Sequence, residues 1–64
     1  MKISELKELE GQNVFFKNPL GYIQEVTVKR IYLASRMVVY SIKNHDFSGF
    51  DGEFFKTREE AENA

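Results

Sequence analysis

Residues 22–33 read Y-I-Q-E-V-T-V-K-R-I-Y-L, and this stretch decides the fold class. β-branched and aromatic side chains dominate it, and such residues favour a pleated, half-buried strand. The apolar alternation changes face part-way, because Val26 and Val28 share one parity whereas Ile31 has the other. Side chains alternate strictly along a regular strand, so both halves face one core only if a bulge or strong bend lies within residues 28–30. The sequence predicts one long, bent strand.

Shorter strands are predicted on both sides of it. Residues 13–17 contain V-F-F, and residues 37–43 read M-V-V-Y-S-I-K, both typical of strands. Between the first of these and the long strand, Asn18-Pro19-Leu20-Gly21 has the residue types of a type I turn. Residues 34–36 predict a second turn, and residues 44–46 are expected to end the strand that follows. The strands therefore follow one another in antiparallel order.

A hairpin is predicted near the carboxyl end of the chain. Residues 47–50 and 53–56 are two aromatic-rich arms, and Asp51-Gly52 lies between them. Asp-Gly between such arms favours a two-residue hairpin turn. Gly49 leaves open the alternative that the first arm is a loop.

Short helices are predicted at both ends. Ser4 is a candidate amino-terminal cap, and Gly11 can close the helix in the left-handed conformation. Thr57-Arg58-Glu59-Glu60 is a capping box that opens a second, acidic helix. The first helix has an apolar stripe made of Ile3, Leu6 and Leu9.

These elements predict a mainly β protein. Antiparallel strands of this length can curl into a small, partly open SH3-like barrel, which is the first expectation, or form a curved sheet of four or five strands with short terminal helices. With 64 residues, the chain has room for a single domain spanning 1–64. The residues expected in the core are Val14, Phe16, Val26, Val28, Val39 and either Phe54 or Phe55.

Composition narrows the class of protein further. The chain has no cysteine and one histidine, so neither a disulfide nor a multi-histidine metal site can stabilise so small a core. No signal peptide or membrane-spanning segment is recognisable in the sequence, and we expect a cytoplasmic protein with no membrane association. With a net charge of −1, the chain lacks the strongly basic character of most nucleic-acid-binding domains.

Catalytic and metal sites are not expected. Four serines would share the single His45, and none lies in a strand-to-helix elbow. His45, Asp46, Asp51 and Glu53 can be drawn as a metal site, but these residue types are common in turns for backbone reasons alone. The sequence predicts a non-enzymatic protein with no cofactor, no catalytic residues and no metal ligands.

The surplus of aromatic residues carries the functional hypothesis. Nine Phe and Tyr residues occur in 64, more than one small core is expected to enclose. Exposed aromatics beside arginine resemble protein-binding hot spots, so a protein partner is predicted. The residues expected to bind it are Tyr22, Tyr32, Phe47, Phe50, Arg30 and Arg36.

Three alternatives stay open at this point. The aromatics can instead complete the core or cover its ends. The same rings can stack on single-stranded nucleic acid, with phosphate contacts from Lys29, Arg30, Arg36 and Lys43, although this is not favoured. An exposed edge strand can also pair with a second copy to form a homo-oligomer.

The carboxyl-terminal segment F-F-K-T-R-E-E-A-E, residues 54–62, resembles the small uncharacterised accessory proteins that bacteriophages and prophages encode. The resemblance covers these nine residues closely and the rest of the chain in style. It implies a cytoplasmic protein that acts by binding, for example by inhibiting a host protein. It assigns no functional residues.

Overall fold

Residues 2–64 are described by a computed structural model of the protein. Along the chain, the elements are α1 (Ile3–Glu8), β1 (Asn13–Lys17), β2 (Ile23–Tyr32), β3 (Met37–Ile42), β4 (His45–Phe50), the 3-10 turn η1 (Asp51–Glu53), β5 (Phe54–Phe55) and α2 (Arg58–Glu62). The described helices are short, and none of them is long and apolar enough to cross a membrane.

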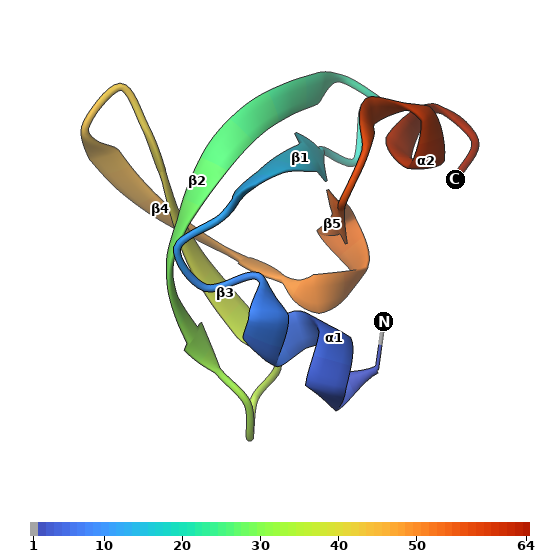
Figure 1. The fold of residues 1–64 in the computed structure, drawn as a ribbon. Coiled ribbons are helices and arrows are strands. Elements are labelled where there is room, and N and C mark those ends of the chain that lie inside the picture. Colours follow the sequence, from blue (N-terminus) through green and yellow to red (C-terminus); the bar gives the residue numbers. More distant parts are fainter. Residues whose placement is uncertain (1) are drawn as a thin grey trace.

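The strands form one open antiparallel sheet with the order β4-β3-β2-β1-β5. Figure 1 shows how strongly this sheet curves, with α2 beside the end where β1 and β5 meet. β4 and β5 are the two edges and do not pair with each other. The mainly β prediction, with a curved antiparallel sheet and short terminal helices, is therefore confirmed, and the sheet is not closed into a barrel.

The bulge predicted in the long strand is present. β2 pairs with β3 through Val28 opposite Tyr40 and then Arg30 opposite Val39, so Lys29 is an extra residue with no counterpart in β3. The shift returns Ile31 to the face that holds Val28, because one added residue inverts the alternation. This explains how residues of opposite parity both face the core.

Two turn predictions have different outcomes. The turn after β1 is confirmed, since the Gly21 amide donates to the Asn18 carbonyl at 2.9 Å and the Asn18 side-chain oxygen accepts from the amides of Leu20 and Tyr22. The break predicted at residues 44–46 is shifted, because the turn lies at Lys43 and Asn44, with φ of 52° and 70°. His45 and Asp46 already belong to β4.

The hairpin predicted at Asp51-Gly52 is wrong. These residues lie in η1, and Gly52 does not adopt the positive φ that a type I′ turn needs. The 3-10 turn carries the chain away from β4, and β5 pairs with β1 through Phe15 opposite Phe55. The two aromatic arms therefore lie at opposite edges of the sheet.

The core lies on one face of the sheet, called here the core face, and the opposite face is called the outer face. Fully buried apolar side chains on the core face include Val28, Val38 and Phe54. The prediction that Val39 lies in the core is wrong. Val38 is buried instead, and Val39 is half-buried on the outer face. The core cluster is Leu6, Leu9, Val14, Val26, Val28, Val38, Tyr40 and Phe54, with Phe16, Ile31, Leu33 and Ile42 packed against it.

The helices form where expected; the amino-terminal cap of α1 differs from the prediction, whereas Thr57 caps α2 as predicted. Ser4 is inside α1 rather than at its cap, which is Lys2 and makes no side-chain hydrogen bond. Gly11 has a φ of 81°, as expected for a glycine that reverses the chain after the helix. In α2 the Thr57 hydroxyl accepts from the Glu60 amide at 3.1 Å, which is one of the two bonds of the predicted capping box.

Candidate protein-binding surface

Three side chains from adjacent strands form a row on the outer face. Met37 of β3 lies opposite Tyr32 of β2 on one side and opposite Phe50 of β4 on the other. Residues directly opposite one another project on the same side of a sheet, with Cβ atoms about 5 Å apart. Tyr32 is 47% exposed and Phe50 is 59% exposed. We call Tyr32, Met37 and Phe50 the outer row.

The neighbouring row adds a cation and a small polar group. Arg30, Val39 and Ser48 lie opposite one another across β2, β3 and β4. Arg30 is exposed, and Val39 is half-buried on the same face as the outer row. Arg30 thus lies two residues before Tyr32 in β2, on the same face of the sheet.

An ion pair fixes the end of this surface. The Arg36 Nε donates to the Asp51 carboxylate at 2.7 Å, and the Asp51 amide donates to the Arg36 carbonyl at 3.1 Å. Arg36 has a positive φ of 57° in the turn before β3, while Asp51 begins η1. These contacts join the turn to η1 directly beside Phe50. The charge of Arg36 is therefore matched by a carboxylate rather than standing alone.

The structure separates two of the predicted binding residues from the others. Phe47 lies opposite Tyr40 on the core face, where the two rings stack with centroids 5.7 Å apart. Tyr22 is 71% exposed but precedes β2, whereas Tyr32 is the last residue of that ten-residue strand, so the two rings lie at opposite ends of β2. The expected exposure of all four rings is confirmed, but they do not form one patch.

Tyr40 connects the exposed Phe47 to the interior. Its ring stacks on Phe16 at 5.0 Å and meets Phe54 edge-on at 5.3 Å. Burial raises the pKa of the Tyr40 hydroxyl above its usual value near 10, and the nearby Glu53 carboxylate raises it further. These rings therefore form an aromatic ladder from the hydrophobic core to the exposed edge of β4, made of Phe16, Phe54, Tyr40 and Phe47.

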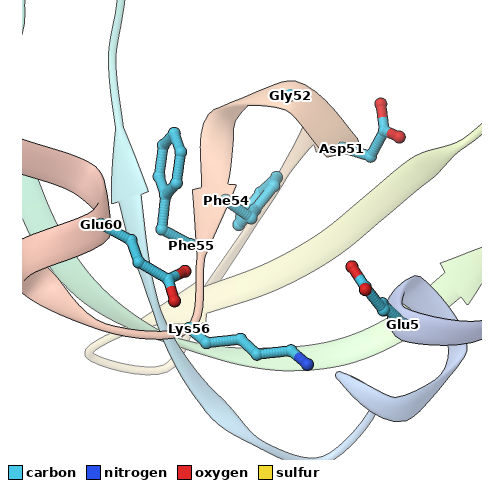
Figure 2. Close-up of a pocket in the computed structure, with 7 residues that line it drawn as sticks. All are labelled: Glu5, Asp51, Gly52, Phe54, Phe55, Lys56 and Glu60. Atoms are coloured by element: carbon cyan, nitrogen blue, oxygen red, sulfur yellow. The ribbon is translucent and has the colours of Figure 1, made fainter. Parts of the chain in front are cut away.

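A cavity of about 340 Å³ opens between η1, β5 and the two helices. Figure 2 shows the Phe54 and Phe55 rings in it, together with the Lys56 side chain and the carboxylates of Glu5 and Glu60. None of its lining residues carries a hydroxyl, thiol or imidazole, so its ionisable side chains are those of Lys56 and the carboxylates. The third carboxylate, that of Asp51, is already paired with Arg36.

The residues drawn as a possible metal site do not converge. His45 and Asp46 are exposed in β4, and the Glu53 carboxylate accepts from the Phe50 amide at 3.0 Å. Within residues 2–64, no three histidine or acidic side chains are grouped closely enough to hold a metal ion.

Met37, the centre of the outer row, is the residue that sequence reasoning missed. In β3, residues 38, 40 and 42 are all apolar, whereas the other parity includes Ser41. The serine indicates the outer parity, which also contains Met37 and Val39. This signal also predicts that Val38, rather than Val39, faces the core.

Comparison with known proteins adds no assignment. The chain matches no protein-family model, no curated protein and no solved structure. The resemblance to bacteriophage accessory proteins therefore stays a prediction.

Proposed function

We propose that this protein is a non-enzymatic protein-binding module that contacts its partner through the outer row and Arg30. The observation that carries the proposal is the position of Tyr32 and Phe50, both about half-exposed, on the two sides of Met37. Large apolar side chains grouped on one exposed face favour association, because a partner can remove them together from water.

The residue types favour a protein as the partner. Tyrosine, methionine, phenylalanine and arginine are enriched in protein interfaces, and tyrosine and arginine in their energetic hot spots. The surface also stands on three paired strands rather than on a loop, so little conformational entropy is lost when it binds.

Nucleic acid is the less favoured ligand. Arg36 is paired with Asp51, and Lys43 lies in the turn at the far end of β3 from the outer row. The cations that would have to contact phosphates are thus spread along the sheet, and the net charge is −1. Fluorescence anisotropy with single-stranded oligonucleotides is the direct comparison, and binding that weakens steeply with salt would favour this alternative.

The decisive test is affinity capture from lysate of the source cells, analysed by quantitative mass spectrometry. A Tyr32→Ala/Phe50→Ala double variant is expected to lose the proteins that the wild type enriches. A Leu20→Ala/Tyr22→Ala variant is the matched control, because it removes a similar exposed apolar area, 82% and 71% exposed, at the opposite end of β2. Equal capture by the wild type and the outer-row variant would remove the proposed surface.

The proposed cellular role is based on the resemblance of residues 54–62 to bacteriophage and prophage accessory proteins. We propose a cytoplasmic accessory protein of bacteriophage or prophage type, whose binding inhibits or redirects a host protein. A partner purified with the wild type should change activity when the protein is added, and should respond less to the outer-row variant.

A further inference from the structure

The exposed edge of β4 has backbone groups aimed at solvent. Lys43 and Asn44 both have positive φ, which identifies a two-residue hairpin turn of type I′, and Ile42 opposite His45 is the pair that flanks it. The pair flanking such a turn is hydrogen-bonded, and hydrogen-bonded and non-bonded pairs then alternate along the ladder. The N–H and C=O groups of Asp46, Ser48 and Phe50 therefore point away from β3.

One of these three residues is already covered. The Phe50 amide donates to the Glu53 carboxylate at 3.0 Å, as expected for a group that does not face β3. Glu53 thus closes the end of the edge next to η1. The groups of Asp46 and Ser48 remain along the open part, and no strand in residues 2–64 lies on that side of β4.

The two sheet edges are protected to different degrees. β5 has two residues and is followed by Lys56 and α2, and short edges flanked by charge and helix resist pairing. β4 has six residues, H-D-F-S-G-F, with no lysine, arginine or proline, and its register with β3 has no bulge. Asp46 is its one acidic side chain, and the lysines, prolines and bulges that commonly prevent an edge strand from pairing are absent from it.

From this geometry we propose that β4 pairs antiparallel with β4 of a second copy, about a two-fold axis at Phe47. Asp46 then lies opposite Ser48 of the second copy, and each of the two such pairs can form two backbone hydrogen bonds. Pairing centred on Ser48 instead would need the Phe50 amide, which Glu53 occupies. The Phe47 rings, each 47% exposed, meet at the axis on the core face.

Self-pairing fits the charges and size of the chain. Asp46 faces a serine, so the register places no like charges directly opposite each other. The net charge of −1 gives little repulsion between copies. A 64-residue chain without cysteine has a small core, and association is one of the ways in which such domains gain stability. The interface is a single strand pair, so the dimer is weak and forms at high concentration.

Residue-resolved amide exchange, measured by NMR at about 50 µM and about 1 mM, tests the pairing directly. For a dimer with a dissociation constant of about 100 µM, the amides of Asp46 and Ser48 are expected to exchange about threefold more slowly at the higher concentration, because exchange follows the monomer fraction. The amides of Phe47 and Gly49 bond to β3 and should not change, which provides an internal control on the same strand. For the same dissociation constant, sedimentation should show a weight-average mass that rises from about 1.4 to about 1.8 times that of the monomer.

Two lysine substitutions test the edge of β4 and the outer row separately. Phe47→Lys places like charges at the two-fold axis and should abolish the concentration dependence, whereas Phe50→Lys, on the opposite face, should retain it. Ser48→Pro removes an edge N–H and changes no residue of the aromatic ladder. It therefore tests the β4 pairing if Phe47→Lys fails to fold. A monomer throughout the range, or a dimer that persists in Ser48→Pro and in folded Phe47→Lys, overturns the proposal. Partner capture through the outer row is independent of either outcome.

Discussion

Phe47 and Phe50 belong to the same strand, yet their rings lie on opposite faces of the sheet. Phe47 shares the core face with Tyr40, and Phe50 shares the outer face with Met37. Both rings are about half-exposed, at 47% and 59%. The three-residue spacing produces this result, because side chains alternate with a period of two. One short edge strand thus presents an aromatic ring to each of two separate surfaces.

Gly49 leaves little room for a side chain, and the nearest atom belongs to the Glu53 carboxylate. A Cβ at this position would lie 3.0 Å from the Glu53 carboxylate and 3.4 Å from the Phe54 ring, which packs over the glycine. We expect Gly49→Ala to reduce the free energy of unfolding by about 1 kcal/mol, because the Glu53 carboxylate must shift and weaken the hydrogen bond that it accepts from the Phe50 amide. Urea unfolding gives the value. Gly52→Ala is the control, since nothing lies within 4 Å of its Cβ; equal losses in both variants would contradict the packing argument.

Leu6 should anchor α1 to the sheet. It is fully buried in the core cluster, whereas Ile3 on the same helix is 51% exposed. Leu6→Ala is expected to cost about 2–5 kcal/mol of unfolding free energy through lost burial and the cavity left behind. Ile3→Ala, measured in the same way, should cost well under half as much. Similar values for the two variants would mean that α1 does not dock as described.

The Asn18 side chain should hold the turn that carries Tyr22. Its Oδ1 accepts from the amides of Leu20 and Tyr22, both at 3.0 Å. Asn18→Ala leaves these donors to solvent, and we expect a loss of about 1 kcal/mol. Asn18→Asp retains an acceptor and is the matched variant. Thermal unfolding of the two distinguishes the loss of the acceptor from the loss of the amide nitrogen.

Tyr40 should make stability fall at alkaline pH. Burial, and then Glu53, raise the pKa of its hydroxyl in the folded state, so the unfolded chain loses this proton first. The stability that the protonated Tyr40 hydroxyl contributes is fully present below its pKa in the unfolded chain, near 10. It is lost as pH rises through the raised pKa of the folded state. Denaturant unfolding should be measured from pH about 8 to above pH about 10. Over this range the free energy of unfolding should decline less in Tyr40→Phe than in the wild type. Parallel declines would contradict the assignment.

Local pattern was sufficient for the bulge and the first turn. The parity change within β2 required an extra residue near Val28, and the structure has it at Lys29. Asn18, Pro19 and Gly21 likewise impose a reversal through their own backbone preferences. In both cases the deciding interactions lie within a few residues of chain, and so they can be read without knowing what packs against them.

Pairing between distant segments was beyond the same reasoning. Asp51-Gly52 has the composition of a hairpin turn, but β5 pairs with β1, where Phe54 enters the core and packs against both Phe16 and Tyr40. The grouping of Tyr22 with Tyr32 failed for a related reason, because exposure says nothing about which end of a strand a residue occupies.

The sequence by itself determined a mainly β protein with one bulged strand, short terminal helices and several aromatic side chains in contact with water. Tertiary structure alone decided that the sheet stays open, that β4 is an edge, and that Tyr32 and Phe50 become neighbours across Met37. The physical reason is that turns and alternation depend on neighbouring residues, whereas edges and surfaces depend on which distant strands bury their apolar faces together.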